Sequence, residues 1–241
     1  MKKPKTVASF RFFYYNFVTS NLNVCMTKDE MTDVDYEKLV NSILSIMMKR
    51  GILSTTMDQL ASTLRISKRT LYEIFISKDL LVEEVLKAYM VYVRDNQRSI
   101  VDKSENIIDA LIKIFIFSRS LLAEINLDFY RDMDNHLHLQ KDFEETELLY
   151  NAHMLEIIKD GIRKGLVRDD IDFLLMYRLM LIQMNLLKQM DNPFPQDISM
   201  LDVYNTIFLG FLRSIVSHKG MSILDGYLPE YPELNKKLAV V

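Results

Sequence analysis

Residues 56–81 read TMDQLASTLRISKRTLYEIFISKDLL, and this stretch decides the fold of the amino-terminal part of the chain. Thr56 followed by Gln59 has the spacing of a capping box, in which the threonine hydroxyl accepts a backbone N–H and the glutamine reaches back. Apolar residues recur every three or four positions on both sides of Arg65 and Ile66, which predicts two short helices. Ser67 is suited to begin the second of them.

Two short helices in this order predict a helix-turn-helix motif. Such a motif needs a small residue where the helices cross, a tight turn and an apolar residue that closes the core after the turn. Ala61, Arg65 and Ile66 stand at these three positions. Leu71 and Phe75 share one face of the second helix, so the opposite face is available to the major groove of DNA.

Polar and basic side chains occupy that opposite face. Lys68 and Arg69 can donate to guanine O6 and N7 or to phosphate. Hydroxyl groups nearby can donate to phosphates, which fixes the register of the protein on DNA rather than its sequence preference. The predicted DNA-binding residues are Thr56, Ser67, Lys68, Arg69, Thr70, Tyr72 and Lys78.

The composition predicts an all-α protein, because only 6 glycines and 5 prolines occur in 241 residues. The single cysteine, Cys25, excludes an internal disulfide and a cysteine-based zinc cluster, so a reducing cytoplasm is the default compartment. No stretch approaches the roughly 18 uninterrupted apolar residues of a membrane span. Residues 35–98 carry 10 Lys and Arg against 8 Asp and Glu, whereas residues 99–241 carry 15 against 22. A small basic module on an acidic body suits a protein that docks DNA.

The helical pattern divides the chain into parts. Residues 1–34 form an extension that is expected to be disordered, or to precede a natural start at Met26 or Met31. Residues 35–82 form the predicted helix-turn-helix domain, and a helix over 79–98 links it to a larger helical domain over 99–225. Helices in that larger domain are expected near 104–125, 127–135, 139–164, 170–191 and 199–218. Residues 226–241, which contain two prolines, are expected to form an irregular tail.

The motif resembles the DNA-binding domain of the TetR family of bacterial regulators. The resemblance runs without gaps from Tyr36 to about Leu81 and rests on Gly51, TTMDQLA at 55–61, ISKRTLY at 66–72, Phe75, Lys78 and Leu81. This chain departs from the family pattern at two positions. Arg65 stands where the family usually has glycine, so a residue with a side chain must adopt the turn conformation. Ile74 stands where a polar residue is common, and this costs one backbone contact to DNA.

The resemblance implies an all-α regulator with an amino-terminal three-helix DNA-binding domain and an effector-binding and dimerisation domain over 99–225. It implies a cytoplasmic homodimer that binds a palindromic operator as a repressor and is released by a small molecule. Helices near 170–191 and 199–218 would form a four-helix bundle between two copies. Their apolar stripes fit the core of a monomer equally well.

An apolar, methionine-rich interior over 104–190 suits a hydrophobic effector, although ordinary core packing explains each apolar residue as well. Polar residues that interrupt the apolar periods are the better pointers to a pocket. The predicted effector-binding residues are Tyr130, His153, Arg178, Gln183 and Asn185.

Other functional classes find little support in the sequence. No catalytic motif or phosphate-cradling glycine loop occurs, so neither enzyme activity nor a cofactor is expected. His136 and His138 form a His-x-His pair that helix geometry makes a poor chelate, so no metal site is expected. The alternatives left open are a DNA-bound structural or cell-division factor without an effector and a helical enzyme or metal-binding protein.

Overall fold

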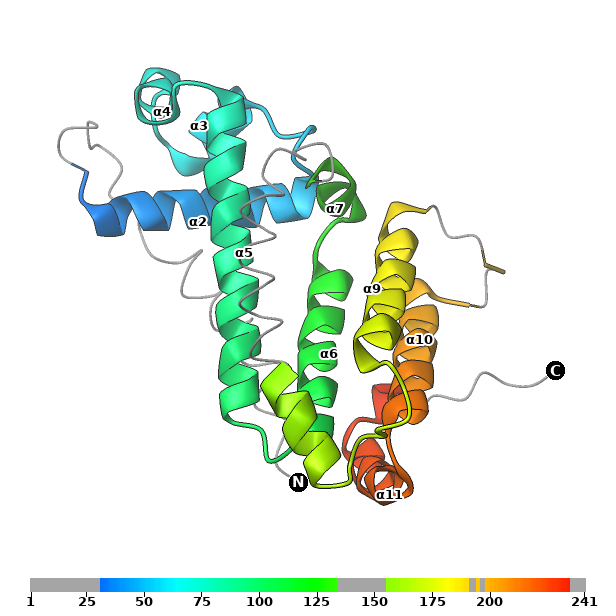
Figure 1. The fold of residues 1–241 in the computed structure, drawn as a ribbon. Helices are drawn as coiled ribbons and strands as arrows, with labels where there is room; N and C mark the ends of the chain where they lie inside the picture. The colour runs from blue at the N-terminus through cyan, green and yellow to red at the C-terminus, as the bar shows by residue number, and fades with distance from the viewer. Residues whose placement is uncertain (1–30, 134–154, 191–193, 196–197, 235–241) are drawn as a thin grey trace. The chain divides into compact units, whose positions relative to one another are not determined.

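The computed structural model describes residues 31–133, 155–190, 194–195 and 198–234 (Figure 1). Every regular element in these ranges is helical, and the only extended pairing there is an isolated antiparallel bridge between Val167 and Val216. The predicted all-α fold is thus confirmed. The described residues form two compact units, one of residues 31–96 and 124–133 and the other of residues 97–123 and 155–234.

The first unit contains α2 (Asp33–Arg50), α3 (Met57–Leu64), α4 (Lys68–Phe75), the first part of α5 (Lys78–Asp102), and α7 (Leu127–Met133). Side-chain caps begin several of these helices. Thr32 and Asp35 form a capping box at α2, Thr56 and Gln59 form the predicted one at α3, and Ser67 accepts the Thr70 N–H at α4. The core of this unit is made of fully buried aliphatic residues, which include Ile43, Met47, Leu60, Leu71, Leu81 and Leu86.

The assignment of α7 to this first unit differs from the domain boundary expected near residue 98. Phe129 of α7 is fully buried and packs edge-on against Tyr89 of α5 with ring centroids 5.3 Å apart. The backbone N–H of Asn126 donates to the Met48 carbonyl at the end of α2, 2.8 Å away. Periodicity identifies the buried face of a helix but not the helix that covers it, so the position of α7 could not be predicted from its residues.

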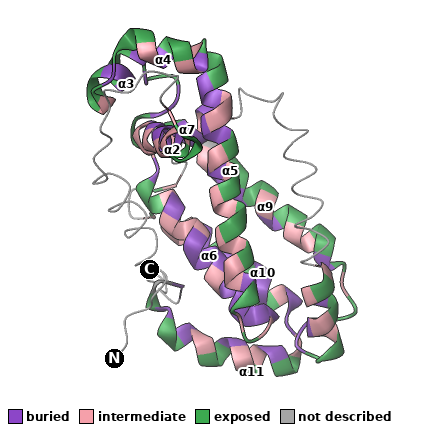
Figure 2. Ribbon diagram, turned by 90° about the vertical axis from the view of Figure 1, so that its left-hand side faces the viewer, coloured by how far each residue is buried: buried purple, intermediate pink, exposed green. Residues whose placement is uncertain are grey.

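The second unit contains the remainder of α5, α6 (Ile107–Glu124) up to residue 123, a helical stretch over 155–163, α9 (Phe173–Gln189), α10 (Met200–Ile215) and α11 (His218–Tyr227). Helices α9 and α10 lie side by side (Figure 1). Phe115 of α6 stacks on Phe208 and Tyr204 of α10, with centroids 3.8 and 5.1 Å apart. Figure 2 shows how largely buried α6 is, as expected for the central helix of an apolar core.

The carboxy-terminal boundaries correct the expectations from sequence. Helix α10 ends at Ile215, and Val216 takes an extended conformation that pairs with Val167 before α11 begins. Residues 226–234 are not an irregular tail, because short 3-10 helices over Leu228–Glu230 and Pro232–Leu234 continue from α11. Their buried residues Leu228, Tyr231 and Leu234 recur every three positions, which matches the 3-10 period, and proline is tolerated at the start of such a turn.

Two residues with positive φ flank α4. Arg65, in the turn between α3 and α4, has φ 58° and ψ 36°, which is the left-handed conformation expected at this position. Ile76 follows α4 with φ 64° and ψ −51°, and the Ser77 N–H donates to the Phe75 carbonyl across it at 2.6 Å. This arrangement is a γ-turn of the strained type, held by a β-branched residue. The helix that carries the predicted DNA contacts is therefore fixed between two strained turns.

We predict that Arg65→Gly stabilises the protein. A left-handed residue with a Cβ costs roughly 1–2 kcal/mol, and the greater freedom of glycine in the unfolded chain cancels part of the gain. The expected net increase in the free energy of unfolding is about 1 kcal/mol, measured by urea denaturation. Ser62→Gly, in the exposed part of α3, is the matched control and should lower the free energy of unfolding by about 0.5 kcal/mol. A loss of stability in Arg65→Gly would contradict the strain argument.

Candidate DNA interface

Helices α3 and α4 pack as a helix-turn-helix at the amino end of α5 (Figure 1). Ala61 and Ile66 are buried, as the motif requires of the crossing residue and of the residue that closes the core. Leu71 and Phe75 anchor α4 from its inner face, and Phe75 also meets the ring of Tyr36 on α2 at 5.8 Å. The position of α4 is therefore set by buried apolar contacts.

The predicted DNA-binding side chains lie on the outer part of this motif. Ser67, Lys68, Arg69 and Tyr72 are exposed, and Tyr72 keeps 41% of its surface despite its size. Thr70 and Lys78 are half-buried, and Thr56 is exposed at the start of α3. The seven residues thus lie at the starts of α3, α4 and α5 and on the outer face of α4, and their contact with DNA stays a prediction.

Both basic residues at the start of α4 are ion-paired in the protein alone. Lys68 Nζ lies 2.7 Å from Asp58 Oδ1 on α3, and Arg69 Nε lies 2.7 Å from Glu73 Oε1 one turn along α4. The hydrogen bond that Lys68 donates to the Asp58 carboxylate raises the pKa of the Lys68 ammonium, and the bond that Arg69 donates to Glu73 raises the pKa of the Arg69 guanidinium in the same way. Both cations therefore stay charged, and their partners are other exposed side chains that a phosphate can replace.

Sequence reasoning missed the role of Asp58. The sequence shows that Asp58 stands in the first turn of the first motif helix, but its pairing with Lys68 depends on how the two helices cross. The Thr56 hydroxyl can both cap α3 and donate a hydrogen bond to DNA. Thr56 Oγ1 accepts the Gln59 N–H at 3.2 Å as a helix cap, which leaves its proton available to donate outward.

The predicted effector residues do not form one cluster. Tyr130 is buried in the first unit, where its hydroxyl interacts with Tyr89, whose pKa burial raises to about 12. Arg178, Gln183 and Asn185 are exposed on α9 in the second unit. His153 lies outside the described residues. The assignment of these five residues to a pocket stays a prediction.

Two hollows among the described residues have other linings. One, of about 620 Å³, lies between α2 and α5 and is lined in part by Tyr36, Val40, Glu84 and Val91. The other, of about 770 Å³, lies beside the Val167–Val216 bridge. A polar pair that the sequence did not reveal joins half-buried Arg119 Nε of α6 to buried Asn205 Oδ1 of α10 at 2.9 Å.

None of the helices in the described ranges is both long and apolar enough to cross a membrane. No three histidine, cysteine or acidic side chains gather as metal ligands within those ranges. His136 and His138 lie outside them.

Comparison with known proteins connects this geometry to a family. A family model described as bacterial regulatory proteins, tetR family, matches residues 39–85, which span α3, α4 and parts of α2 and α5. The chain is 26% identical to the HTH-type transcriptional repressor KstR2 of Mycobacterium tuberculosis (strain ATCC 25618 / H37Rv) over 146 residues, which are 58% of this chain and 73% of the relative. It is 27% identical to KstR2 of Mycolicibacterium smegmatis over 147 residues, covering 59% and 72% of the two chains.

A more distant relative and a solved structure agree with this match. The uncharacterized HTH-type transcriptional regulator YvaF of Bacillus subtilis is 30% identical over 88 residues, which are 36% of this chain and 46% of the relative. The structure of the ketosteroid transcriptional regulator KstR2 of Mycobacterium tuberculosis aligns with a TM-score of 0.55 at 22% identity, covering 78% of this chain and 98% of that one, which shows a shared fold. Residues 39–85 thus match the TetR family of bacterial regulatory proteins, and over more than half of its length the chain is similar to helix-turn-helix transcriptional repressors.

Proposed function

We propose that this protein is a repressor that binds a palindromic operator as a homodimer and is released by a small molecule. The observation that carries the DNA-binding part is the outward face of α4, where Lys68, Arg69 and Tyr72 are exposed on a helix anchored by buried Leu71 and Phe75. The relatives named as transcriptional repressors support repression rather than activation. As a regulator of bacterial genes, the protein is expected in the cytoplasm.

In this proposal the amino end of α4 enters the major groove. Lys68 and Arg69 exchange the Asp58 and Glu73 carboxylates for guanine edges or phosphates, and neither exchange needs a buried group to be exposed. Thr56, Thr70, Tyr72 and Lys78 donate to phosphates on either side of the groove. The carboxylates left behind repel the DNA backbone, which disfavours binding wherever α4 lacks its base contacts.

The dimer part of the proposal rests on an exposed apolar stripe along α9. Leu175, Leu179, Ile182 and Leu186 recur at spacings of four, three and four residues, and each keeps between 46% and 55% of its surface exposed. Figure 2 shows α9 as largely exposed or half-buried along its length. A stripe of this kind indicates a protein partner. A second copy is the partner that fits, because an eight-residue recognition helix reads one half-site and specificity requires two.

The effector part of the proposal concerns the second unit and the five residues predicted from sequence. The predicted residues Tyr130, His153, Arg178, Gln183 and Asn185 are kept as candidates, and Arg178, Gln183 and Asn185 stand on the helix that bears the apolar stripe. A hydrophobic small molecule is proposed because of the apolar interior of the second unit. A relative described as a ketosteroid transcriptional regulator is consistent with that class.

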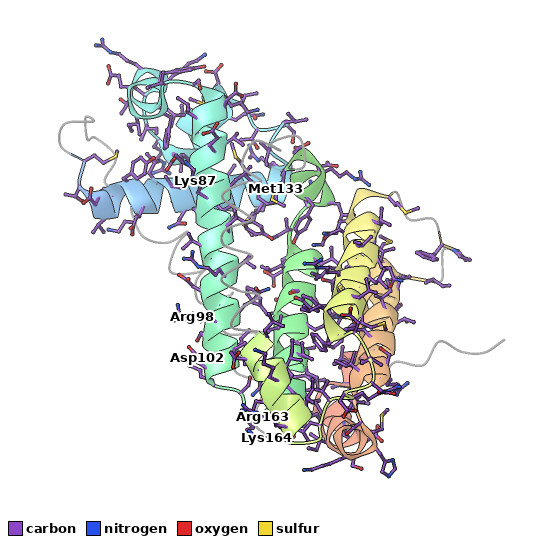
Figure 3. The ribbon with its side chains drawn as sticks, in the orientation of Figure 1. Lys87, Arg98, Asp102, Met133, Arg163 and Lys164 are labelled. Carbon is purple, nitrogen blue, oxygen red and sulfur yellow. The ribbon has the colours of Figure 1, made fainter. Side chains whose placement is uncertain are left out.

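We predict that Lys68→Ala and Arg69→Ala each weaken specific operator binding by about tenfold or more, because each removes a donor to base edges or phosphate. The operator is first recovered by selection from random duplex DNA with the unaltered protein, and affinities are then measured by fluorescence anisotropy. Lys87→Ala is the control, since Lys87 (Figure 3) carries the same charge on α5. There it pairs with Glu84 at 3.1 Å. Equal losses for all three variants would show that charge, and not α4, determines the affinity.

We also predict that Ile182→Glu dissociates the homodimer, with a dissociation constant raised more than tenfold, because a charge would be buried in the stripe. Sedimentation velocity over a concentration series measures this. Val91→Glu adds the same charge at an exposed apolar residue of α5 and should leave the dimer intact. A dimer that persists in Ile182→Glu would rule out α9 as the interface.

A further inference from the structure

The loop between α2 and α3 is held by a segment that lies far away in the sequence. The Asn126 backbone N–H donates to the Met48 carbonyl at 2.8 Å, and its side-chain amide donates to the Lys49 carbonyl at 3.4 Å. These bonds satisfy carbonyl groups at the end of α2 that have no partner within the helix. Helix α7 begins directly after Asn126, and Met133 at its far end is marked in Figure 3.

Asp132 of α7 makes the most direct contact with this loop. Its side chain is almost fully buried, and its Oδ2 atom accepts the Leu53 backbone N–H at 2.7 Å. The loop can approach α7 closely because residue 51 is a glycine, with φ 89°. A Cβ at that position would lie 3.1 Å from Asp128 Cβ and 3.3 Å from Asp132 Oδ2. The loop backbone is thus pressed against α7, and Asp132 provides a charged acceptor for a donor that α3 does not use.

The carbonyl group of Leu53 is bound by a predicted phosphate ligand, Lys78. Lys78 Nζ donates to the Leu53 carbonyl at 3.2 Å, while the Leu53 side chain remains 63% exposed and contributes little packing. The backbone of Leu53 therefore joins the Asp132 carboxylate to the Lys78 ammonium. Thr56, the cap of α3, follows Leu53 by three residues, so the same loop also sets where α3 begins.

We propose that Asp132 is a positioning residue for DNA binding, acting through the Leu53 backbone to hold the Lys78 ammonium where it meets a phosphate. Asp132 itself has no contact with DNA in this arrangement. The inference rests on the proposed function, since it takes Lys78 as a phosphate ligand. It goes beyond that function because it places a determinant of DNA affinity in α7, more than fifty residues after the helix-turn-helix.

A double-mutant cycle tests the proposal, because a purely structural role for Asp132 would act independently of Lys78. The full-length variants Asp132→Ala, Lys78→Ala and the double variant are measured on the selected operator by fluorescence anisotropy at several salt concentrations. Each single variant should weaken binding by about tenfold and reduce the slope of log affinity against log salt by about one phosphate contact. The double variant should lose no more than either single variant.

Matched controls separate the possible outcomes. In Asp132→Ala combined with Lys68→Ala, the fold-loss of affinity should equal the product of the two single fold-losses. The two residues should act independently because Lys68 pairs with Asp58 on α3 and not with the Leu53 backbone. Asp128→Ala, on the exposed side of α7, should leave affinity unchanged. Asp132→Asn should recover most of the affinity, since its amide oxygen can still accept the Leu53 N–H. If Asp132→Ala does not fold, Asp132→Glu takes its place in the cycle, because it keeps the charge and displaces the carboxylate.

Two results would overturn the inference. If the fold-loss of affinity in the Asp132 and Lys78 double variant equals the product of the two single fold-losses, the two residues act independently. Unchanged affinity in Lys78→Ala would also remove its basis, and the proposed function would nevertheless stand if Lys68→Ala still weakened binding. If neither Lys68→Ala nor Lys78→Ala weakened operator binding, α4 would instead be rejected as the helix that reads DNA.

Discussion

The burial of Leu71 and Phe75 is the interaction on which the rest of this structure depends. The two side chains are almost fully buried and hold α4 against the first unit. Burial of a leucine or phenylalanine side chain contributes roughly 1.5–3 kcal/mol, which exceeds what exposed ion pairs usually add. The outer residues of α4 therefore do not determine where the helix lies. They can be exchanged between protein carboxylates and DNA without loss of the fold.

The polar groups around α4 serve folding and recognition together. Thr56 and Ser67 accept backbone N–H groups as helix caps. The Thr56 hydroxyl proton remains available to an acceptor outside the helix, and the Ser67 hydroxyl shares a 2.8 Å hydrogen bond with the Thr70 hydroxyl. Asp58 and Glu73 keep Lys68 and Arg69 charged and oriented before DNA arrives. The donors of the first unit are thus held in position before DNA binds, so fewer side chains have to be immobilised on binding. The strained turns at Arg65 and Ile76 are consistent with a helix whose position matters more than local stability.

The predictable part of the structure is the part that local rules determine. Capping at Thr56 and Ser67, the buried Ala61 and the left-handed Arg65 all follow from residues within a few positions of one another. The docking of α7 on α2 and the contact between Asp132 and Leu53 could not be predicted, because they join segments 79 residues apart and periodicity does not specify a partner. The ordered residues 228–234 were missed for a different reason. Two prolines suggested irregular chain, although a three-residue apolar spacing was present.

The central claim is that α4 reads the major groove, and methylation interference on the selected operator tests it most directly. Guanine N7 lies in the major groove and adenine N3 in the minor groove, so the two modifications distinguish the routes of contact. If α4 reads the major groove, N7 methylation should block binding at guanines in two half-sites about one helical turn or a multiple of it apart, and N3 methylation should have no effect there. Interference from adenine N3 alone would contradict it.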